Sequence, residues 1–566
     1  MKLVVIGGVT GGASTAARVR RLDADAEIVM FERGEHVSFS NCALPYYLGG
    51  VVADSASLLV VTPEDFKNQH DIEVWTKSEV TAINRDRRTV TVRETETGRE
   101  YEEGYDKLML APGANPILPK SIKGIERENV FTVRNVTDIV KLKAYADRND
   151  VRNVVVVGGG FIGVEVAENL RSAGKDVSLI EGTNQIMAPF DYDMVQILHK
   201  EMDDNGVRLY LNSTVTEIHD GGVTAVKDEV PFETAADLVV MAIGVAPETK
   251  LAQEAGLEIG ETRGIKVNHN YQTSDPDIYA VGDVIEGYNR LTRAPGRLAL
   301  AGPAQRQARA AADHMYGIPH NHTGFIGSSC IRIFGQNAAA TGLSEKAAEK
   351  AGLTYDSVLL FPADKPGPMP DSHYMAFKLI FEVPTGRILG AQAIGPGSAD
   401  KRVDVIAALI MMGGTLEDLK EMELCYSPVF GTAKDIVNMA ALVALNILYG
   451  RYRQVHVREV RRLAENGAYI IDVREPDEYA AGHIKGAHNI PLSVLREHLD
   501  EIPKDVPVYL HCRSSQRSYY ALSALLGRGF KNVVNISGSF LGISLYEYFN
   551  DKTQGREPIV TAYNFD

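Results

Sequence analysis

Short runs of uninterrupted apolar residues alternate with helix-length segments over roughly the first third of the chain, a pattern typical of parallel α/β structure. Each apolar run has the length of a strand, and each segment that follows has the length of a helix. Glycine clusters between them mark tight turns. The pattern therefore predicts two β-α-β units. The strands are expected at residues 3–6, 27–32, 154–157 and 177–181, and the helices at 13–22 and 165–173.

The pattern continues with further strands and helices beyond the second unit. A third piece alternates strand-like and helix-like runs from residue 325 to about residue 445, and a small α/β pattern restarts after residue 455. Between them, residues 450–454 have the composition of a short linker. The expected strands are 278–283, 376–381, 388–395, 469–474 and 506–511, and helices are expected from Arg402 and over 518–526. Residues 108–114 are expected to close the first unit before the second begins.

Composition narrows the class of protein. At 566 residues the chain is long enough for three to four domains. Its net charge of −15 argues against binding to nucleic acid or to an anionic membrane. Four cysteines do not form a disulfide framework, and the N-terminus lacks the features of a signal peptide, so we expect a cytoplasmic protein. The apolar run 405–412 is too short to span a bilayer and is expected to be a buried helix.

The first glycine-rich turn, residues 7–12, has the spacing of a dinucleotide-binding loop except that Val9 takes the middle glycine position. Gly7 permits the tight turn, and Gly12 permits close packing of the helix, whose N-terminus would face a pyrophosphate. Glu32 ends the next strand and is placed to bind ribose hydroxyls.

The second glycine-rich turn fits the dinucleotide fingerprint fully. Gly158, Gly160 and Gly163 supply its three glycines, and Glu181 ends the following strand. A carboxylate at that position would repel the 2′-phosphate of NADPH. The sequence therefore favours NADH, and NADPH stays open.

Two isolated cysteines are the candidate nucleophiles. Cys42 follows the first β-α-β unit, and Cys512 lies in the loop between an expected strand and an expected helix. Because neither belongs to a Cys-x-x-Cys pair, an oxidised Cys42 must be a sulfenic acid, a persulfide or a mixed disulfide. The helix N-terminus after Cys512, together with Arg513 and Arg517, would favour a thiolate and an anionic sulfur adduct.

Three motifs together resemble the flavoprotein disulfide reductases: the Ala111-Pro112-Gly113 crossover, the inserted glycine fingerprint, and the strand Tyr279-Ala280-Val281-Gly282-Asp283. The resemblance implies FAD in the first unit and NADH in the second. By that resemblance, the FAD contacts are Gly7, Gly12, Glu32, Gly113 and Asp283, and the NADH contacts are Gly158, Gly160, Gly163 and Glu181, with Arg33, Ala301 and Gly244 as further cofactor contacts.

The segment around the single cysteine, residues 38–47, resembles the coenzyme A disulfide reductase branch of that family. The resemblance implies coenzyme A as a substrate or bound ligand, with its phosphates held by arginines on one face of the first helix. The implied substrate contacts are Ser14, Arg18, Arg21, Ser38 and Asn41. A solvated basic face is the alternative for the two arginines, and a buried structural thiol is the alternative for Cys42.

The two C-terminal pieces carry resemblances of their own. Residues 325–445 are similar to the dimerisation domain of the same family, which implies a homodimer and brings Tyr426 to the partner's active site; a packing aromatic is the alternative. The strings at 472–479 and 482–491 and the loop from Cys512 to Arg517 resemble rhodanese. In that resemblance Cys512 accepts a sulfane sulfur and Arg517 binds substrate; an inactive docking module is the alternative.

The sequence thus predicts an α/β protein with two Rossmann-like domains, an α+β dimerisation domain and a C-terminal rhodanese domain. Its expected activity is FAD-dependent reduction by NADH of coenzyme A persulfide, polysulfide or coenzyme A disulfide, with Cys42 as the redox sulfur and Cys512 loading or relaying sulfur. No metal, nucleic acid or membrane is expected. An NADH oxidase or peroxidase that cycles Cys42 through sulfenic acid is the rival enzyme. The expected ranges are 1–112 with 242–320 for FAD, 113–241 for NADH, 321–446 for dimerisation, 447–455 for a linker and 456–566 for rhodanese.

Overall fold

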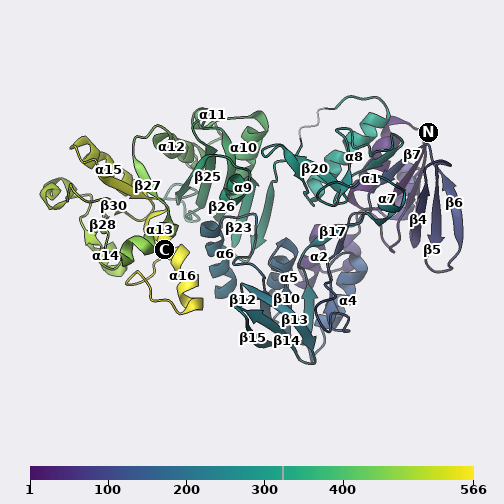
Figure 1. The fold of residues 1–566 in the computed structure, drawn as a ribbon, viewed down its shortest axis with the longest axis horizontal. Coiled ribbons are helices and arrows are strands. Elements are labelled where there is room, and N and C mark those ends of the chain that lie inside the picture. The colour runs from purple at the N-terminus through teal and green to yellow at the C-terminus, as the bar shows by residue number, and fades with distance from the viewer. Residues whose placement is uncertain (321–323, 566) are drawn as a thin grey trace. The chain divides into compact units, whose positions relative to one another are not determined.

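A computed structural model of the chain describes residues 1–320 and 324–565 (Figure 1). The chain packs into two compact units. The first contains Met1–Asn184 and Gly206–Phe325, and the second contains Gln185–Asn205 and Ile326–Asp566. The expected boundary between residues 320 and 321 adjoins residues that lie outside the described ranges.

A five-stranded parallel sheet forms the centre of the first unit. Alternate residues of its central strand β1 face opposite sides, as the period of a strand requires. Leu3 and Val5 pack with alanines of helices α1 and α8, and Val4 and Ile6 pack with valines of a three-stranded antiparallel sheet. The bounds are β1 Lys2–Ile6, β2 Glu27–Phe31, β3 Glu73–Trp75, β7 Lys107–Leu110, β19 Ile278–Ala280, α1 Thr10–Leu22, α8 Ala301–Met315, β4 Ser78–Asn84, β5 Thr89–Glu94 and β6 Glu100–Gly104.

A second parallel sheet, β12-β11-β10-β16-β9, repeats this design in the same unit. Val155 and Val157 of β10 pack with a second antiparallel sheet, β13-β14-β15, and α5 contacts β10 and β11. The chain passes from the first sheet to the second through β8 and returns through β17, and these two short strands pair with one another in antiparallel fashion. The bounds are β8 Ala114–Pro116, β9 Val130–Phe131, α4 Val136–Ala146, β10 Asn153–Val157, α5 Phe161–Ser172, β11 Asp176–Ile180, β12 Arg208–Tyr210, β13 Ser213–His219, β14 Gly222–Lys227, β15 Val230–Ala235, β16 Leu238–Met241 and β17 Val245–Pro247.

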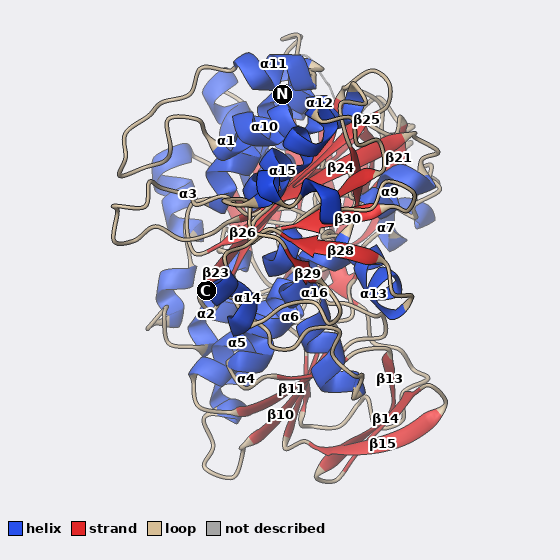
Figure 2. Cartoon of the chain, turned by 90° about the vertical axis from the view of Figure 1, so that its left-hand side faces the viewer, coloured by secondary structure: helices blue, strands red, loops and turns tan. Residues whose placement is uncertain are grey.

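The second unit holds two further five-stranded sheets, drawn as red arrows in Figure 2. One is antiparallel, β22-β23-β26-β25-β24, and the other is parallel, β27-β31-β30-β28-β29. The bounds in the antiparallel part are β22 Ser329–Ile333, β23 Gln336–Gly342, α9 Glu345–Lys350, β24 Tyr355–Leu360, β25 Ala376–Glu382, β26 Ile388–Gly395, α10 Ala399–Met412, α11 Leu416–Glu421 and α12 Ile436–Leu448. In the parallel part they are β27 Arg453–Val455, α13 Val457–Glu465, β28 Tyr469–Asp472, α14 Pro476–Ala481, β29 His488–Asn489, β30 Val508–His511, α15 Gln516–Gly527, β31 Val533–Ile536 and α16 Ser539–Gln554.

The structure differs from the expected ranges at the linker, whose first residues 447 and 448 end helix α12, and at helix α6. Residues 453–455, expected in a linker, form β27, because their backbone pairs with β31 at the edge of the C-terminal sheet. Helix α6, Tyr192–Asp204, lies in the range expected for the NADH domain but packs with the second unit, where it contacts β22, β26 and α16. Its buried residues, such as Met194 and Leu198, explain that packing.

A fully buried lysine joins several elements of the second unit. The Nζ atom of Lys378 on β25 lies 2.8 Å from Asp193, 3.3 Å from Asp191 and 3.3 Å from Glu345. Glu345 also accepts a 2.6 Å contact from Arg458 on α13. Burial raises the pKa of Asp191 to about 6, whereas the nearby cations outweigh burial at Glu345 and lower its pKa to about 2.

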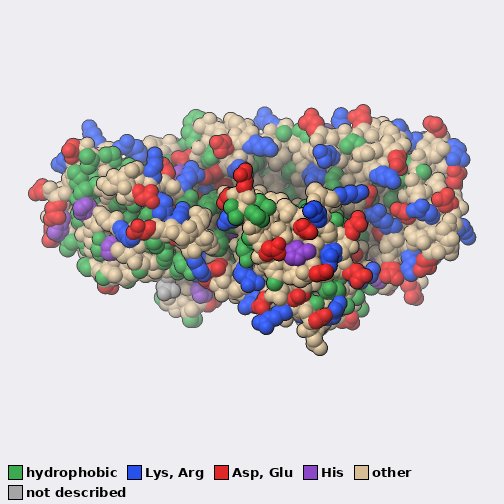
Figure 3. All heavy atoms as spheres, turned by 60° about the horizontal axis from the view of Figure 1, so that its bottom comes forward, with side chains coloured by type: hydrophobic (Ala, Val, Ile, Leu, Met, Phe, Trp, Pro, Cys, Tyr) green, Lys and Arg blue, Asp and Glu red, His purple; other side chains and the backbone are tan. Residues whose placement is uncertain are grey.

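No helix among the described residues is both long and apolar enough to cross a membrane. Within the same residues, histidine, cysteine and carboxylate side chains form no group of three or more that could hold a metal ion. On the face drawn in Figure 3, lysine and arginine side chains are interspersed with carboxylates.

Replacing Lys378 with methionine should destabilise the second unit strongly, because Asp191 and Asp193 lose their ion-pair partner and Glu345 keeps only Arg458. Removing one partner of a buried ion pair typically costs about 3–5 kcal/mol in the free energy of unfolding. Urea unfolding followed by circular dichroism measures the change. The control is Lys401→Met, at an exposed ion pair where the expected change is below about 1 kcal/mol. Equal unfolding midpoints for the two variants would contradict the prediction.

Candidate active site

The first glycine loop closes tightly on its neighbours. Gly7 has a φ of +96°, and a Cβ atom there would lie 2.2 Å from the carbonyl oxygen of Ala111. A Cβ atom on Gly12 would lie 1.8 Å from the carbonyl oxygen of Gly7, so α1 packs against the turn as expected. The Glu32 carboxylate accepts hydrogen bonds from the backbone N–H groups of Gly8 (2.9 Å) and Gly34 (2.8 Å). The strand-end carboxylate is thereby fixed beside the loop.

The second loop repeats this arrangement. A Cβ atom on Gly163 would lie 1.9 Å from the carbonyl oxygen of Gly158, whereas one on Gly160 would meet nothing within 4 Å. That open space lets a phosphate approach the backbone at the helix N-terminus. Glu181 accepts from the backbone N–H groups of Gly159 (2.7 Å) and Thr183 (2.8 Å). Both loops therefore fit a dinucleotide.

The remaining predicted cofactor contacts lie at the ends of the same elements. Gly113 has a φ of +76° with open space at its Cβ position, and Gly244 has a φ of +125°. Asp283 follows β19, where burial raises the pKa of its carboxyl. Ala301 begins α8. Arg33 is exposed and lies 3.2 Å from Glu248.

Cys42 lies on a single 3₁₀ turn, Asn41–Ala43, just before helix α2, Leu44–Leu48. Its side chain is accessible. Partial burial and the negative charges of Glu165 and Asp283 raise the pKa of the Cys42 thiol. The protein groups around Cys42 thus favour the thiol over the thiolate.

Glu165 is a site residue that the sequence analysis did not single out. It lies on α5, where burial raises the pKa of its carboxyl to about 7, and the hydroxyl of Tyr46 donates to its Oε1 at 3.4 Å. Glu165 stands two residues after Gly163 in the fingerprint. That position could have marked it as close to the cofactor, but no spacing in the sequence indicates that α5 meets the Cys42 turn.

Of the predicted coenzyme A contacts, one arginine is ion-paired within the protein and the other residues are exposed or half-buried. Arg18 is ion-paired with Asp313 on α8, at 2.6 Å from Nε and 2.5 Å from Nη2. Arg21 and Asn41 are exposed, and Ser14 is half-buried. Ser38 has a φ of +45°, and its backbone bonds to Gly8 and to Val60. The structure thus places these residues on α1 and on the segment leading to Cys42.

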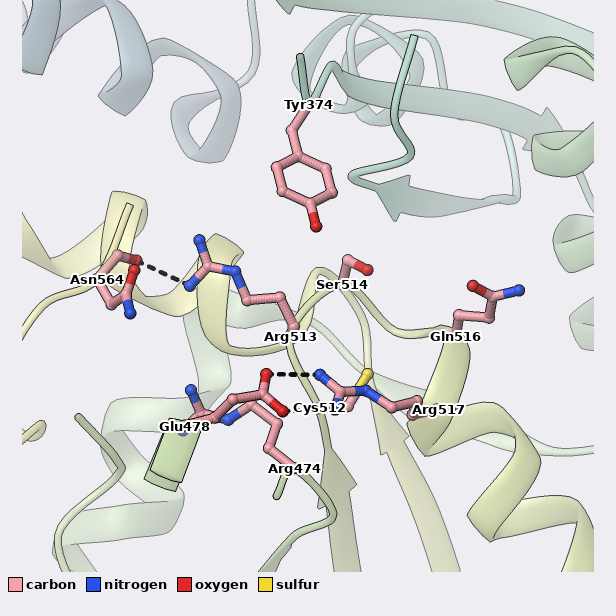
Figure 4. A pocket seen from close by; sticks show the side chains of 9 residues that line it. All are labelled: Tyr374, Arg474, Glu478, Cys512, Arg513, Ser514, Gln516, Arg517 and Asn564. Atoms are coloured by element: carbon pink, nitrogen blue, oxygen red, sulfur yellow. Dashed lines mark hydrogen bonds and ion pairs between the residues drawn. The ribbon is translucent and has the colours of Figure 1, made fainter. Parts of the chain in front are cut away.

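Cys512 occupies a different environment in the second unit. It follows β30 and precedes α15, is only 1% exposed, and its backbone N–H donates to Ser539 Oγ at 3.3 Å. A cavity of about 450 Å³ opens beside it (Figure 4). The lining residues are Tyr374, Arg474, Glu478, Cys512, Arg513, Ser514, Gln516, Arg517 and Asn564.

The arginines that line this cavity are held in place. Arg517, the predicted substrate contact, forms a bidentate ion pair with Glu478 at 2.5 and 2.7 Å, which raises the pKa of its guanidinium. Arg474 is buried and pairs with Asp472 at 2.6 Å. Arg513 donates to the backbone carbonyl oxygen of Asn564 at 3.3 Å. Glu478, Tyr374 and Asn564 were not predicted from the sequence, since only the fold brings them to Cys512.

Tyr426 lies in the loop between α11 and α12, where its side chain is 53% exposed. Phe430 in the same loop is 75% exposed, and its backbone carbonyl oxygen accepts from Arg402 at 3.1 Å. Tyr426 is therefore available to another molecule. Its role near a partner's active site stays a prediction.

Comparison with known families accounts for three parts of the chain. Residues 1–308 match the model of pyridine nucleotide-disulphide oxidoreductase, and residues 331–435 match the dimerisation domain of that family. Residues 456–545 match the rhodanese-like domain.

Individual proteins agree with that division. A coenzyme A disulfide reductase from Staphylococcus haemolyticus is 33% identical over 447 residues, covering 79% of this chain and 100% of the relative. The crystal structure of reduced CoADR-RHD from Bacillus anthracis is 42% identical, with a TM-score of 0.93 over 97% of this chain and 98% of that one. An NAD-dependent persulfide reductase from A. fulgidus is 33% identical, with a TM-score of 0.89 over 95% of this chain and 99% of that one.

The fold and the two nucleotide loops define a flavoprotein oxidoreductase of the disulfide reductase class joined to a rhodanese-like domain. The chain belongs to the pyridine nucleotide-disulphide oxidoreductase family. The expected fold class is confirmed, and the family implies FAD and a nicotinamide nucleotide as cofactors.

Replacing Glu165 with glutamine should lower the pKa of Cys42, because a carboxylate with a pKa of about 7 is ionised where the thiol titrates and opposes the thiolate. The rate of iodoacetamide alkylation at Cys42, followed by mass spectrometry across pH, measures the pKa. Glu100→Gln, at an exposed position on β6, is the control, since Glu100 is not among the charges that shift the pKa of Cys42 or of Glu165. An unchanged alkylation profile in Glu165→Gln would contradict the assignment.

Proposed function

We propose that this protein uses NADH, through FAD, to reduce coenzyme A persulfide or polysulfide, and also coenzyme A disulfide, at Cys42. The observation that carries the proposal is that Cys42 is accessible and is the one cysteine of the first unit, so it cannot form a disulfide within that unit. A lone, accessible thiol of this kind suits exchange with sulfur brought by a substrate.

The chemistry at Cys42 is a thiol exchange followed by reduction. With coenzyme A persulfide, the Cys42 thiolate takes the outer sulfur and coenzyme A leaves as its thiol. Two electrons and a proton then release hydrosulfide and restore the thiolate. With coenzyme A disulfide, the exchange forms a mixed disulfide, and the same two electrons and a proton release the second thiol. FAD supplies these electrons from NADH when both are bound.

Glu165 can hold the proton that this reaction needs. A carboxyl with a pKa of about 7 is partly protonated at neutral pH, which suits a group that gives a proton to a leaving sulfur and regains it. The Tyr46 hydroxyl, 3.4 Å from Oε1, orients that carboxyl.

The cofactors and substrate have residues suited to hold them. We assign FAD to the loop with Gly7, Gly12 and Glu32 and to Arg33, Gly113, Asp283 and Ala301, and NADH to Gly158, Gly160, Gly163, Glu181 and Gly244. Coenzyme A is assigned to Ser14, Arg18, Arg21, Ser38 and Asn41. Arg21 is exposed for a phosphate, whereas Arg18 would bind one while keeping Asp313 as its partner.

Cys512 is assigned the loading or relay of sulfane sulfur. It lies at the cavity lined by Arg474, Arg513 and Arg517, and such a cationic site suits an anionic persulfide.

We also propose a homodimer through the region that matches the dimerisation domain, with Tyr426 serving the partner's site. The four free cysteines support a reducing, cytoplasmic environment.

Anaerobic NADH consumption with coenzyme A persulfide should yield one sulfide per NADH, and Cys42→Ser should lower this rate by several orders of magnitude. NADH absorbance and sulfide, quantified in the same tube, measure it. The companion assay supplies oxygen or peroxide in place of the sulfur substrate. NADH consumption there that is unaffected by added coenzyme A persulfide or coenzyme A disulfide would favour the oxidase or peroxidase instead.

Cys512→Ser should leave NADH-dependent reduction of coenzyme A disulfide unchanged and remove transfer of sulfane sulfur from an added donor. Transfer is followed as persulfide on the protein by mass spectrometry. Sulfide release from the donor that is unaffected by the substitution would favour a docking role for the rhodanese-like domain.

Glu181→Ala should raise the ratio of kcat/KM for NADPH to that for NADH by about tenfold or more, because the carboxylate that repels a 2′-phosphate is gone. Steady-state rates with each nucleotide and coenzyme A disulfide measure the ratio. Glu254→Ala, at an exposed site on α7 (Lys250–Glu254), should leave the ratio unchanged. A ratio in Glu181→Ala equal to that of the control would contradict the preference.

A further inference from the structure

The cavity at Cys512 is completed by a residue from outside the rhodanese-like domain. Tyr374 lies just before β25, within the region that matches the dimerisation domain, yet it lines the cavity with Arg513 and Arg517. Figure 4 shows its hydroxyl pointing into the cavity from the side opposite Arg474 and Glu478.

A well-bonded hairpin holds Tyr374 in this position. Its backbone pairs with Ala363, the backbone N–H of Asp364 donates to the carbonyl oxygen of His373 at 2.8 Å, and the backbone N–H of His373 donates to Asp364 Oδ1 at 2.8 Å. The Ser372 hydroxyl closes the hairpin on the carbonyl oxygen of Lys365 at 2.8 Å. The ring is thus presented by an ordered segment.

The cavity has the charge of an anion site. Three of its lining residues are arginines and one, Glu478, is a carboxylate. Glu478 and Asp472 already engage Arg517 and Arg474, which fixes both guanidinium groups. Tyr374 adds a neutral donor, since its hydroxyl has no hydrogen-bond partner anywhere in residues 1–320 and 324–565, and its side chain is 43% exposed.

We propose that Tyr374 is a specificity-determining residue of the Cys512 site, whose hydroxyl donates a hydrogen bond to the anionic group of a small sulfane-sulfur donor. This inference rests on the proposed sulfur transfer at Cys512. The cavity volume of about 450 Å³ suits a low-molecular-mass donor, because small-ligand pockets span about 300–1,000 Å³.

The transfer step is balanced for such a donor. The Cys512 thiolate attacks the outer sulfur of thiosulfate, a bond forms between the two sulfurs, and the bond between the outer sulfur and the sulfonate breaks. Sulfite leaves with the electron pair, and Cys512 becomes a persulfide anion. Tyr374 keeps its proton throughout and binds the oxygen atoms of the leaving group.

The test compares a charged donor with an uncharged one in the full-length protein. With thiosulfate as donor and cyanide as acceptor, Tyr374→Phe should lower kcat/KM about tenfold, mostly through KM, as is typical when a hydrogen bond to a charged group is lost. With dimethyl trisulfide, a neutral donor, the same variant should match the unsubstituted protein. Tyr449→Phe, at an exposed tyrosine outside the cavity, is the matched control and should change neither value.

The outcomes separate this inference from the proposed function. Equal losses with both donors would mean that Tyr374 only supports the fold of the cavity, which overturns the inference. If Tyr374→Phe leaves kcat/KM with thiosulfate unchanged while Cys512→Ser is inactive, the inference is overturned and the proposed transfer at Cys512 stands. Transfer that persists in Cys512→Ser overturns the proposed transfer at Cys512 and the inference with it.

Discussion

The buried ammonium group of Lys378 links elements that are distant in the sequence of the second unit. Its three carboxylate partners are Asp191 just before α6, Asp193 in α6 and Glu345 in α9, and Glu345 also pairs with Arg458 of the C-terminal domain. A fully buried lysine can stay charged because these carboxylates surround it, and the lysine in turn offsets part of the free-energy cost of burying them. Tyr374, just before β25, likewise reaches the C-terminal domain, where it lines the Cys512 cavity.

The two nucleotide loops show one physical solution used twice. In each, a glycine turn approaches neighbouring backbone too closely for any side chain, and a glutamate at the end of the next strand accepts from the loop itself. These hydrogen bonds therefore fix the orientation of each carboxylate beside its loop. The first loop tolerates Val9 because the tight turn and the helix contact depend on Gly7 and Gly12.

The two cysteines proposed as nucleophiles, Cys42 and Cys512, have opposite surroundings. Cys42 is accessible and faces the carboxylates of Glu165 and Asp283, whereas Cys512 is buried at the base of a cavity lined by arginines. Carboxylates nearby suit a sulfur that must exchange protons as it releases thiol or sulfide, and guanidinium groups suit a sulfur that carries an anionic adduct. This contrast supports distinct roles for the two cysteines within one chain.

The sequence by itself determined the two β-α-β units, the glycine loops, the strand-end glutamates and both cysteine loops, because each depends on residues close together in the chain. The helix expected at 13–22 is α1, Thr10–Leu22, and the strand expected at 506–511 is β30, Val508–His511. Only the tertiary structure decided that Glu165 meets Cys42, that Arg18 is paired with Asp313, that α6 packs with the second unit, and that Tyr374 and Glu478 line the cavity. Such contacts join residues far apart in the chain, and they depend on burial and charge balance that local patterns of apolar residues do not encode.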